Sequence, residues 1–127
     1  MLQKKACHEY IISIGSNSDN DNAIQNVKTA FEFLKQKFDA VTFSGIIPTR
    51  AIGTKVDCTF FNAVAGIKTP VKPAQLKSLL KETEKEMGRI PNSEEVLIDL
   101  DIILVDGKIV HEDYENRGFI RDLITTI

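Results

Sequence analysis

The sequence predicts an α+β sandwich in which two amphipathic helices pack on one face of an antiparallel sheet. Short β-prone runs and two long segments of helical periodicity follow one another in the order β-α-β-β-α-β. The length of 127 residues is enough for one domain that buries a core of its own. A hairpin and a short helix are expected after the last of these elements.

The first half of the chain predicts a strand, a helix and a second strand. Residues 10–14 are β-prone, and residues 39–47 are the next β-prone segment. Between them, a helix over 20–37 is predicted by apolar residues that recur at spacings of three and four, namely Ile24, Val27, Phe31, Leu34 and Phe38. Pro48 is expected to stop regular pairing, so residues 48–59 are predicted to form a long connection.

The second half repeats the strand and helix pattern. Residues 60–68 alternate as in a strand, and Pro73 then begins a helix that Gly88 is expected to end in the left-handed conformation. The buried face of this helix is predicted to be Leu76, Leu79, Leu80, Thr83 and Met87. Residues 96–105 are the most strand-like run, and a tight turn at Asp106 and Gly107 leads into residues 108–110. This order is the split βαβ pattern of a ferredoxin-like sandwich, predicted as one domain over 1–127.

The charge balance and composition exclude several classes of protein. Sixteen Lys and Arg against eighteen Asp and Glu give a net charge of −2, which is not the basic field of a duplex-binding protein, so no nucleic-acid partner is expected. No apolar run is long enough to span a membrane, and the first residues do not resemble a signal peptide, so a cytoplasmic protein without a membrane partner is expected. Cys7 and Cys58 are expected to be free thiols, and neither they nor His8 and His111 have a partner at metal-ligand spacing.

Two acids on one predicted strand give the sharpest chemical signal. Side chains two residues apart on a strand share a face, so Asp99 and Asp101 project together while Ile98, Leu100 and Ile102 point into the core. Neighbouring carboxylates repel each other unless a cation or a shared proton compensates, and oxygen ligands of this kind suit Mg²⁺ that bridges phosphates. The alternative is a solvated strand face with two unrelated acids.

Three further motifs are compatible with ligand binding. Phe60 and Asn62 share a strand face and place an aromatic ring beside an amide, which could stack on a planar heterocycle and bind its donor and acceptor edge. Arg117, close to Phe119, suits bidentate contact with phosphate. Residues 15–17 either bring backbone N–H groups close to a ligand or form a turn that caps the following helix.

Taken in order, these motifs resemble the 6-hydroxymethyl-7,8-dihydropterin pyrophosphokinases of folate biosynthesis. The matching segments run almost from end to end: YIISIGSN, Thr49 and Gly53, FFNAVAGIKTPVKPAQL, Glu84 with MGR, IDLDIILVDGK, and NRGF. The resemblance implies a ferredoxin-like fold and an ATP-dependent diphosphotransferase. Such an enzyme moves the β,γ-pyrophosphoryl group of ATP to the hydroxymethyl oxygen of the reduced pterin, releases AMP and requires two Mg²⁺ ions.

The resemblance also implies three groups of site residues. The catalytic group, in which the two acids are also the metal ligands, is Asp99, Asp101 and Arg89. The pterin-binding group, with two rings that sandwich the pterin and an amide that reads its 2-amino-4-oxo edge, is Thr49, Phe60, Asn62 and Phe119. The nucleotide-binding group is Glu84, His111 and Arg117. The implied partners are ATP and a reduced pterin, and a monomer is expected.

The loop after Arg89 departs from the family pattern. Residues 90–97 are short and acidic, and Val96 stands where the resemblance leads us to expect an arginine. Loss of one charge-assisted phosphate contact costs about 2 to 4 kcal/mol in a transition state. Two alternatives therefore stand beside an active enzyme: a catalytically weakened paralogue that binds pterin or nucleotide, and a ferredoxin-like interaction domain.

Overall fold

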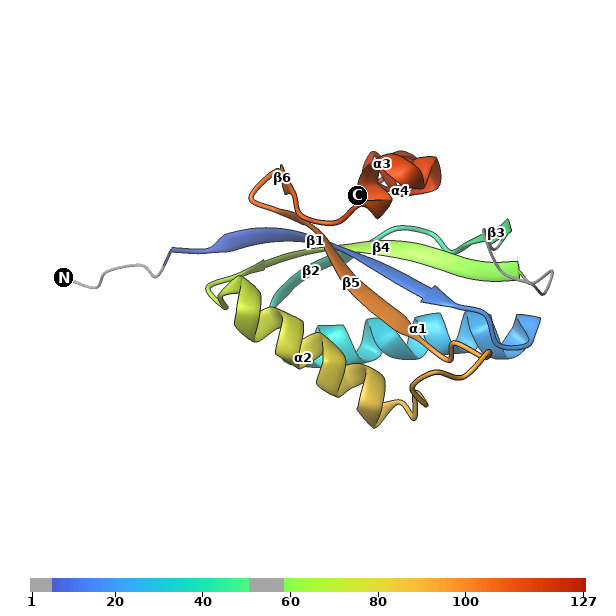
Figure 1. The fold of residues 1–127 in the computed structure, drawn as a ribbon. Coiled ribbons are helices and arrows are strands. Elements are labelled where there is room, and N and C mark those ends of the chain that lie inside the picture. The colour runs from blue at the N-terminus through green and yellow to red at the C-terminus, as the bar shows by residue number, and fades with distance from the viewer. Residues whose placement is uncertain (1–5, 51–58) are drawn as a thin grey trace.

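The computed structural model describes residues 6–50 and 59–127 and shows one sheet with helices on both faces (Figure 1). The elements are, in chain order, β1 (His8–Ser16), α1 (Asn20–Lys37), β2 (Ala40–Phe43), β3 (Ile47–Arg50), β4 (Thr59–Thr69), α2 (Pro73–Glu86), β5 (Asp99–Val105), β6 (Lys108–Ile109), α3 (Asp113–Asn116) and α4 (Gly118–Ile124). This confirms the predicted ferredoxin-like α+β class. The short terminal helix that the sequence predicts is present as two pieces, α3 and α4.

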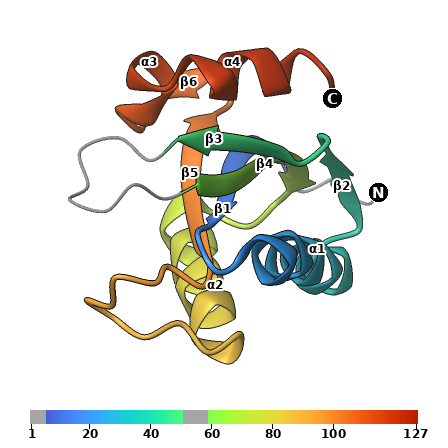
Figure 2. The same cartoon turned by 90° about the vertical axis from the view of Figure 1, so that its right-hand side faces the viewer.

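The sheet has the strand order β2-β4-β1-β5-β6, and β3 also pairs with β4. All of these pairings are antiparallel. The long helices α1 and α2 lie on one face, whereas α3 and α4 lie on the other (Figures 1 and 2). Within the described ranges, α1 and α2 therefore cover one face of the central strand β1, and the C-terminal segment covers part of the other face.

The main core lies between the sheet and the two long helices. Tyr10, Ile12 and Ile14 of β1 point into it and are buried, because alternate side chains of a strand share a face. A second apolar cluster lies under α4 on the opposite face and contains Val64, Ile103, Ile120 and Leu123. No helix among the described residues is long and apolar enough to cross a membrane. Cys7 is an exposed free thiol, and Cys58 lies outside the described residues.

The predicted helices and turns agree well with the structure. The first helix has the predicted bounds, and the second begins at Pro73 as expected. Gly88, with φ of +96°, ends the second helix region in a left-handed conformation. Asp106 and Gly107 have φ of +50° and +81°, which are the values of a tight hairpin turn between β5 and β6.

The burial of the helix faces differs in detail from the predicted stripes. Ala23 and Ala30 of α1 are fully buried, whereas Ile24 is only half-buried, so the buried stripe is rotated slightly toward the small residues. On α2 the prediction holds for Leu76, Leu80 and Thr83. The buried face of α2 also includes a charged residue, Glu84, which the periodicity did not assign to it.

The prediction that Pro48 stops regular pairing is wrong. Pro48 lies within β3, where it faces Phe61 of β4. Since β3 pairs with β4 and with no other described strand, a residue without an N–H group can be accommodated at its outer edge. Of the strand predicted over 39–47, Ala40–Phe43 forms β2, and Ile47 is the first residue of β3. Between the two strands, the Ser44 hydroxyl accepts a hydrogen bond from the Val64 N–H at 2.8 Å. The strand predicted from residue 96 begins at Asp99.

Candidate active site

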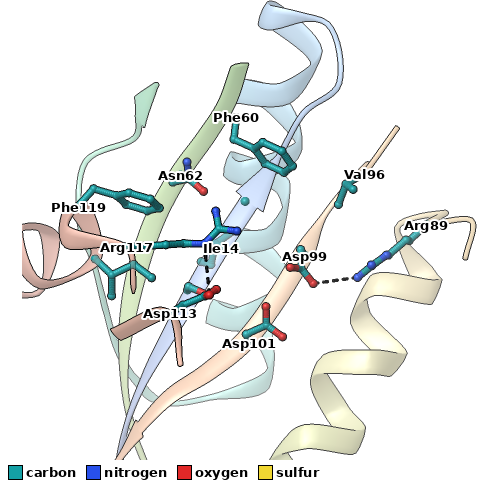
Figure 3. Close-up of a pocket in the computed structure, with 13 residues that line it drawn as sticks. Ile14, Phe60, Asn62, Arg89, Val96, Asp99, Asp101, Asp113, Arg117 and Phe119 are labelled. Carbon is teal, nitrogen blue, oxygen red and sulfur yellow. Dashed lines mark hydrogen bonds and ion pairs between the residues drawn. The ribbon is translucent and has the colours of Figure 1, made fainter. Parts of the chain in front are cut away.

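A pocket of about 120 Å³ opens on the face of the sheet that α1 and α2 leave free. Strands β1, β4 and β5 form its floor, and the segment around α3 and α4 forms one wall (Figure 3). Most of the residues predicted for the site line it, namely Phe60, Asn62, Arg89, Asp99, Asp101, Arg117 and Phe119. The pairing of β1 with β4 and β5, together with the α3 and α4 segment, thus brings together residues that are far apart in the sequence.

The aromatic and amide part of the pocket lies on β4 and α4. Phe60 and Phe119 flank Asn62, which is 8% exposed (Figure 3). The side-chain Nδ2 of Asn62 donates a hydrogen bond to the Thr49 hydroxyl of β3 at 2.5 Å. Thr49 therefore holds the amide from behind and fixes its orientation, and the amide oxygen is left to face Gly15.

Gly15 of β1 provides the space that Asn62 occupies. A Cβ atom built on Gly15 would lie 2.8 Å from the Asn62 Oδ1 and 3.7 Å from the Phe60 ring. The first of these distances is too short for a carbon and an oxygen that are not bonded, so any side chain at residue 15 would displace the amide. The sequence motif at residues 15–17 contributes to the site in this way, through the absence of a side chain.

The acidic part of the pocket lies on β5. Asp99 forms an ion pair with Arg89, with 2.9 Å between Oδ1 and Nη1, and this pair is drawn in Figure 3. Burial raises the pKa of Asp101 to about 6, and the charge of Asp99 and a hydrogen bond to it contribute to the same shift. Burial opposes the charge of Arg89, but Glu84 and Asp99 outweigh this effect and raise its pKa. Of the two acids on β5, Asp99 therefore forms an ion pair with an arginine, whereas no such pair is formed by Asp101 within the described part of the chain.

Asp101 also belongs to a cluster with His111 and Asp113. One ligand atom from each of the three residues lies within 4.8 Å of the others. Carboxylate oxygens are the donors that Mg²⁺ prefers, so Asp99, Asp101 and Asp113 fit a divalent cation in chemical type, and the imidazole of His111 widens the choice of metal. Sequence reasoning missed Asp113. A signal was available, since Asp113 precedes Arg117 by four residues and their side chains form an ion pair of 3.3 Å.

The three residues predicted to contact the nucleotide lie in different surroundings. Arg117 lines the pocket beside Phe119 (Figure 3). His111 lines a neighbouring groove of about 520 Å³ between α2 and the β5–β6 hairpin, together with Asp101 and Lys81. Glu84 is buried, and its carboxylate contacts Arg89, Lys81 and the backbone of β5.

Hydrogen bonds connect the acidic loop after Arg89 to the residue that follows β1. The side chain of Asn17 accepts a hydrogen bond from the Val96 N–H and donates one to the Glu94 carbonyl at 3.1 Å. Asn26 of α1 donates to the Leu97 carbonyl at 3.2 Å. Val96 itself lines the pocket. Asn17, directly after β1, and Asn26 therefore organise this loop. An apolar side chain, Val96, lies at the pocket wall where the resemblance leads us to expect a cation.

These features define a ferredoxin-like α+β protein whose open face carries a pocket with an aromatic half and an acidic half. The family model described as "7,8-dihydro-6-hydroxymethylpterin-pyrophosphokinase (HPPK)" matches residues 11–127, and the chain belongs to this family. The resemblance derived from the sequence is thereby confirmed. Enzymes of this family use ATP and, in general, Mg²⁺.

Curated relatives agree with this assignment. A folate synthesis bifunctional protein of Chlamydia caviae is 34% identical over 134 residues, which cover 91% of this chain and 29% of that protein. A folate synthesis bifunctional protein of Arabidopsis thaliana is 30% identical over 94% of this chain and 27% of its own length. The 2-amino-4-hydroxy-6-hydroxymethyldihydropteridine pyrophosphokinase of Haemophilus influenzae is 29% identical over 86% of this chain and 74% of its own length. The chain thus spans under a third of the two bifunctional proteins.

Proposed function

We propose that this chain transfers pyrophosphate from ATP to 6-hydroxymethyl-7,8-dihydropterin, giving AMP and the pterin diphosphate in folate biosynthesis. Membership of the family supports the reaction, and the pocket supports the residue roles that the resemblance implies. The proposal also includes a monomer that acts in the cytoplasm, a single domain over 1–127 and two Mg²⁺ ions.

The observation that carries the proposal is the position of Asp101 between two cavities. Asp101 lines the pocket that contains Phe60, Asn62 and Phe119, and it also lines the groove beside α2. A transfer between two substrates requires two adjacent binding sites with the reacting groups at their junction. An acid able to hold a cation at this junction is suited to polyphosphate chemistry.

In the proposed complex, the pocket binds the pterin. Phe60 and Phe119 stack on the two faces of the planar ring, and the amide of Asn62 pairs with its donor and acceptor edge. The hydrogen bond from Asn62 to Thr49 sets the amide in one orientation before the ligand arrives. This preorganisation favours a ligand whose hydrogen-bonding edge matches that orientation.

The triphosphate lies in the groove and extends toward Asp101. Lys81 lines the groove beside His111, and Arg89 and Arg117 lie at the pocket side. The lysine and the two arginines therefore provide cationic groups along the path of the phosphates. Asp99 and Asp101 would hold Mg²⁺, with Asp113 as a further oxygen donor. When bound, Mg²⁺ neutralises phosphate charge and lowers the pKa of a hydroxyl group that approaches it.

The reaction forms one bond and breaks another. The hydroxymethyl oxygen attacks the β-phosphorus, the bond between that phosphorus and the oxygen linking it to the α-phosphate breaks, and AMP leaves with that oxygen. The hydroxyl proton passes to solvent. The chain's own residues position the two substrates and stabilise the charge that moves onto AMP, which is most of what phosphoryl-type transfer requires of a protein.

The decisive experiment is a coupled assay of AMP formation from ATP and the reduced pterin in the presence of Mg²⁺. Asp99→Asn and Asp101→Asn should each reduce the rate at least a hundredfold, because each removes a charged metal ligand and leaves the fold intact. The matched control is Asp122→Asn, which changes an exposed acid on α4 and should leave the rate unchanged.

The other outcomes separate the alternatives. Binding of the pterin without AMP formation would indicate the catalytically weakened paralogue, which the acidic loop and Val96 favour. If neither the pterin nor ATP with Mg²⁺ binds, an interaction domain remains. AMP formation that is insensitive to both substitutions contradicts the assignment of the acids.

A further inference from the structure

Glu84 is a charged side chain in the interior of the molecule. It lies on α2 and is 4% exposed, whereas Glu82 and Glu86 on the same helix are exposed. A carboxylate can be buried only where cations and hydrogen-bond donors replace the water that it loses. The partners of Glu84 therefore indicate what this charge does.

Both carboxylate oxygens of Glu84 have such partners. Oε2 accepts a hydrogen bond from the Leu100 N–H at 2.7 Å. Oε1 lies 3.0 Å from Nη1 of Arg89, and both oxygens lie 3.4 Å from Nζ of Lys81. One anion thus binds the backbone of β5 and two cations at the same time.

The backbone contact is made between the two acids of the site. Leu100 stands between Asp99 and Asp101 in β5, which pairs with β1 on one side and with β6 only at Leu104 and Val105. Glu84 accepts at Leu100 the hydrogen bond that a further strand would otherwise accept. This contact fixes the strand at Leu100, and the directions of the flanking acid side chains depend on that backbone.

The cation contacts connect the same acids to α2. Nη1 of Arg89 lies 3.0 Å from Glu84 and 2.9 Å from Asp99, so Leu100, Glu84, Arg89 and Asp99 form a closed ring of contacts. On the other side, Lys81 lines the groove together with Asp101. Each acid of β5 therefore has near it a cation that Glu84 holds.

We propose that Glu84 is a positioning residue for the reaction: it fixes the β5 segment that carries Asp99 and Asp101, and it orients Arg89 and Lys81 toward the phosphates without contacting the nucleotide itself. This role differs from the nucleotide contact that the family resemblance implies for Glu84. Its catalytic part rests on the proposed function, whereas its structural part does not.

The structural part is tested by amide hydrogen exchange in the ligand-free protein, measured by NMR for the wild type and for Glu84→Gln. The Leu100 amide should exchange slowly in the wild type and at least tenfold faster in Glu84→Gln, because a neutral amide cannot hold both cations and accept the same hydrogen bond. The matched control is Glu82→Gln, which changes an exposed glutamate two residues earlier on α2 and should leave the exchange rate of the Leu100 amide unchanged. A Leu100 amide that exchanges rapidly in the wild type, or equally slowly in folded Glu84→Gln, overturns the proposal.

A second variant keeps the test valid if Glu84→Gln does not fold. Glu84→Asp retains the charge but is one methylene shorter, so the Leu100 amide should again exchange faster while the amides of Ile12 and Ile14 remain protected. Equal exchange rates in Glu84→Asp and the wild type would also overturn the proposal.

The catalytic part is tested by steady-state kinetics of AMP formation. Glu84→Gln should lower kcat about tenfold to a hundredfold and leave the KM for ATP within about twofold. A direct nucleotide contact predicts the opposite, a raised KM for ATP with slow exchange at Leu100. If the wild type forms no AMP, the proposed function fails, but the exchange rates and a Mg²⁺ titration followed by the Asp99 and Asp101 amide shifts still decide on Glu84. The apparent Mg²⁺ affinity should fall severalfold in Glu84→Gln.

Discussion

The two faces of the sheet are built from the same strands but differ in chemistry. On β1, Ile12 and Ile14 point toward α1 and α2 and are fully buried, whereas Ser13 and Gly15 line the pocket on the other side. On β5, Leu100 is buried in the core, while the acids before and after it lie at the pocket. Strand alternation thus allows neighbouring residues to serve stability and binding separately.

The two faces also differ in how fully their buried charged groups are paired with hydrogen-bond donors and cations. The helix-covered face is apolar and closely packed, and its one buried acid on α2 has a complete set of partners. On the pocket face, Asp101 is close to Asp99 and partly buried, which is unfavourable for two charges. Substitutions on the first face should therefore weaken the fold, and substitutions on the second should alter binding with little loss of stability.

The largest expected effect comes from adjacent residues of β1. Ile12→Ala should lower the free energy of unfolding by about 3 kcal/mol, because it removes buried methylene groups and leaves a cavity. Ser13→Ala, on the pocket face, should change it by less than about 0.5 kcal/mol. Urea unfolding followed by circular dichroism measures both values. Similar losses for the two variants would contradict the division between the faces.

Asn62→Ala should have the next largest effect, and it should appear in binding. The variant should weaken pterin binding by about 2 kcal/mol, because the hydrogen-bonding edge of the ligand loses its partner. ATP affinity should change little, since the amide lies in the aromatic half of the site. Calorimetric titration with each ligand tests this. An equal loss for both ligands is incompatible with the role proposed for Asn62.

Gly15→Ala should have a smaller effect of the same kind. The added methyl group would lie 2.8 Å from the Asn62 Oδ1, so the amide must move, and pterin affinity should fall by about 1 to 2 kcal/mol. Gly45→Ala is the matched control, because a Cβ on that exposed residue meets no other atom within 4 Å. Unchanged pterin affinity in Gly15→Ala would show that the amide orientation is not needed for binding.

Periodicity predicted those parts of the site that depend on neighbours in the sequence. Alternation alone places Asp99 beside Asp101 and Phe60 beside Asn62, and a proline and a glycine predicted the ends of α2 correctly. The roles of these residues stay predictions.

Contacts between side chains and different secondary-structure elements, which form only in the folded chain, were not predicted. Asp113 meets Asp101 only because the short helix α3 folds back over the sheet, and such a short segment carries little periodic signal. The burial of Glu84 was also missed, although it follows Leu80 by four residues on the same helix face. A charged side chain normally indicates a solvated position, and only the backbone of β5 and the cations around it reverse that expectation.

The smallest expected effect is an increase in the free energy of unfolding. It measures how much the partly buried Asp101 destabilises the folded protein. Because the pKa of Asp101 is raised to about 6 in the folded protein, above the usual value of 3.8, the unfolded chain ionises first as the pH rises. The folded state therefore loses stability between about pH 4 and pH 6, and the loss persists at higher pH. Asp101→Asn removes the ionisation and should raise the free energy of unfolding at pH 8 by about 1 kcal/mol, since water at this partly open site screens the charge.

Urea unfolding at pH 8 and at pH 3.5, without Mg²⁺, compares the variant with the wild type. The gain should be present at pH 8 and nearly absent at pH 3.5, where the carboxyl group is mostly protonated in both the folded and the unfolded chain. Added Mg²⁺ should reduce the gain at pH 8, because it stabilises the wild type by binding to the ionised acids. A gain of equal size at both pH values would mean that the variant acts through packing, and the pocket face would then differ from the core face in chemistry but not in its cost to stability.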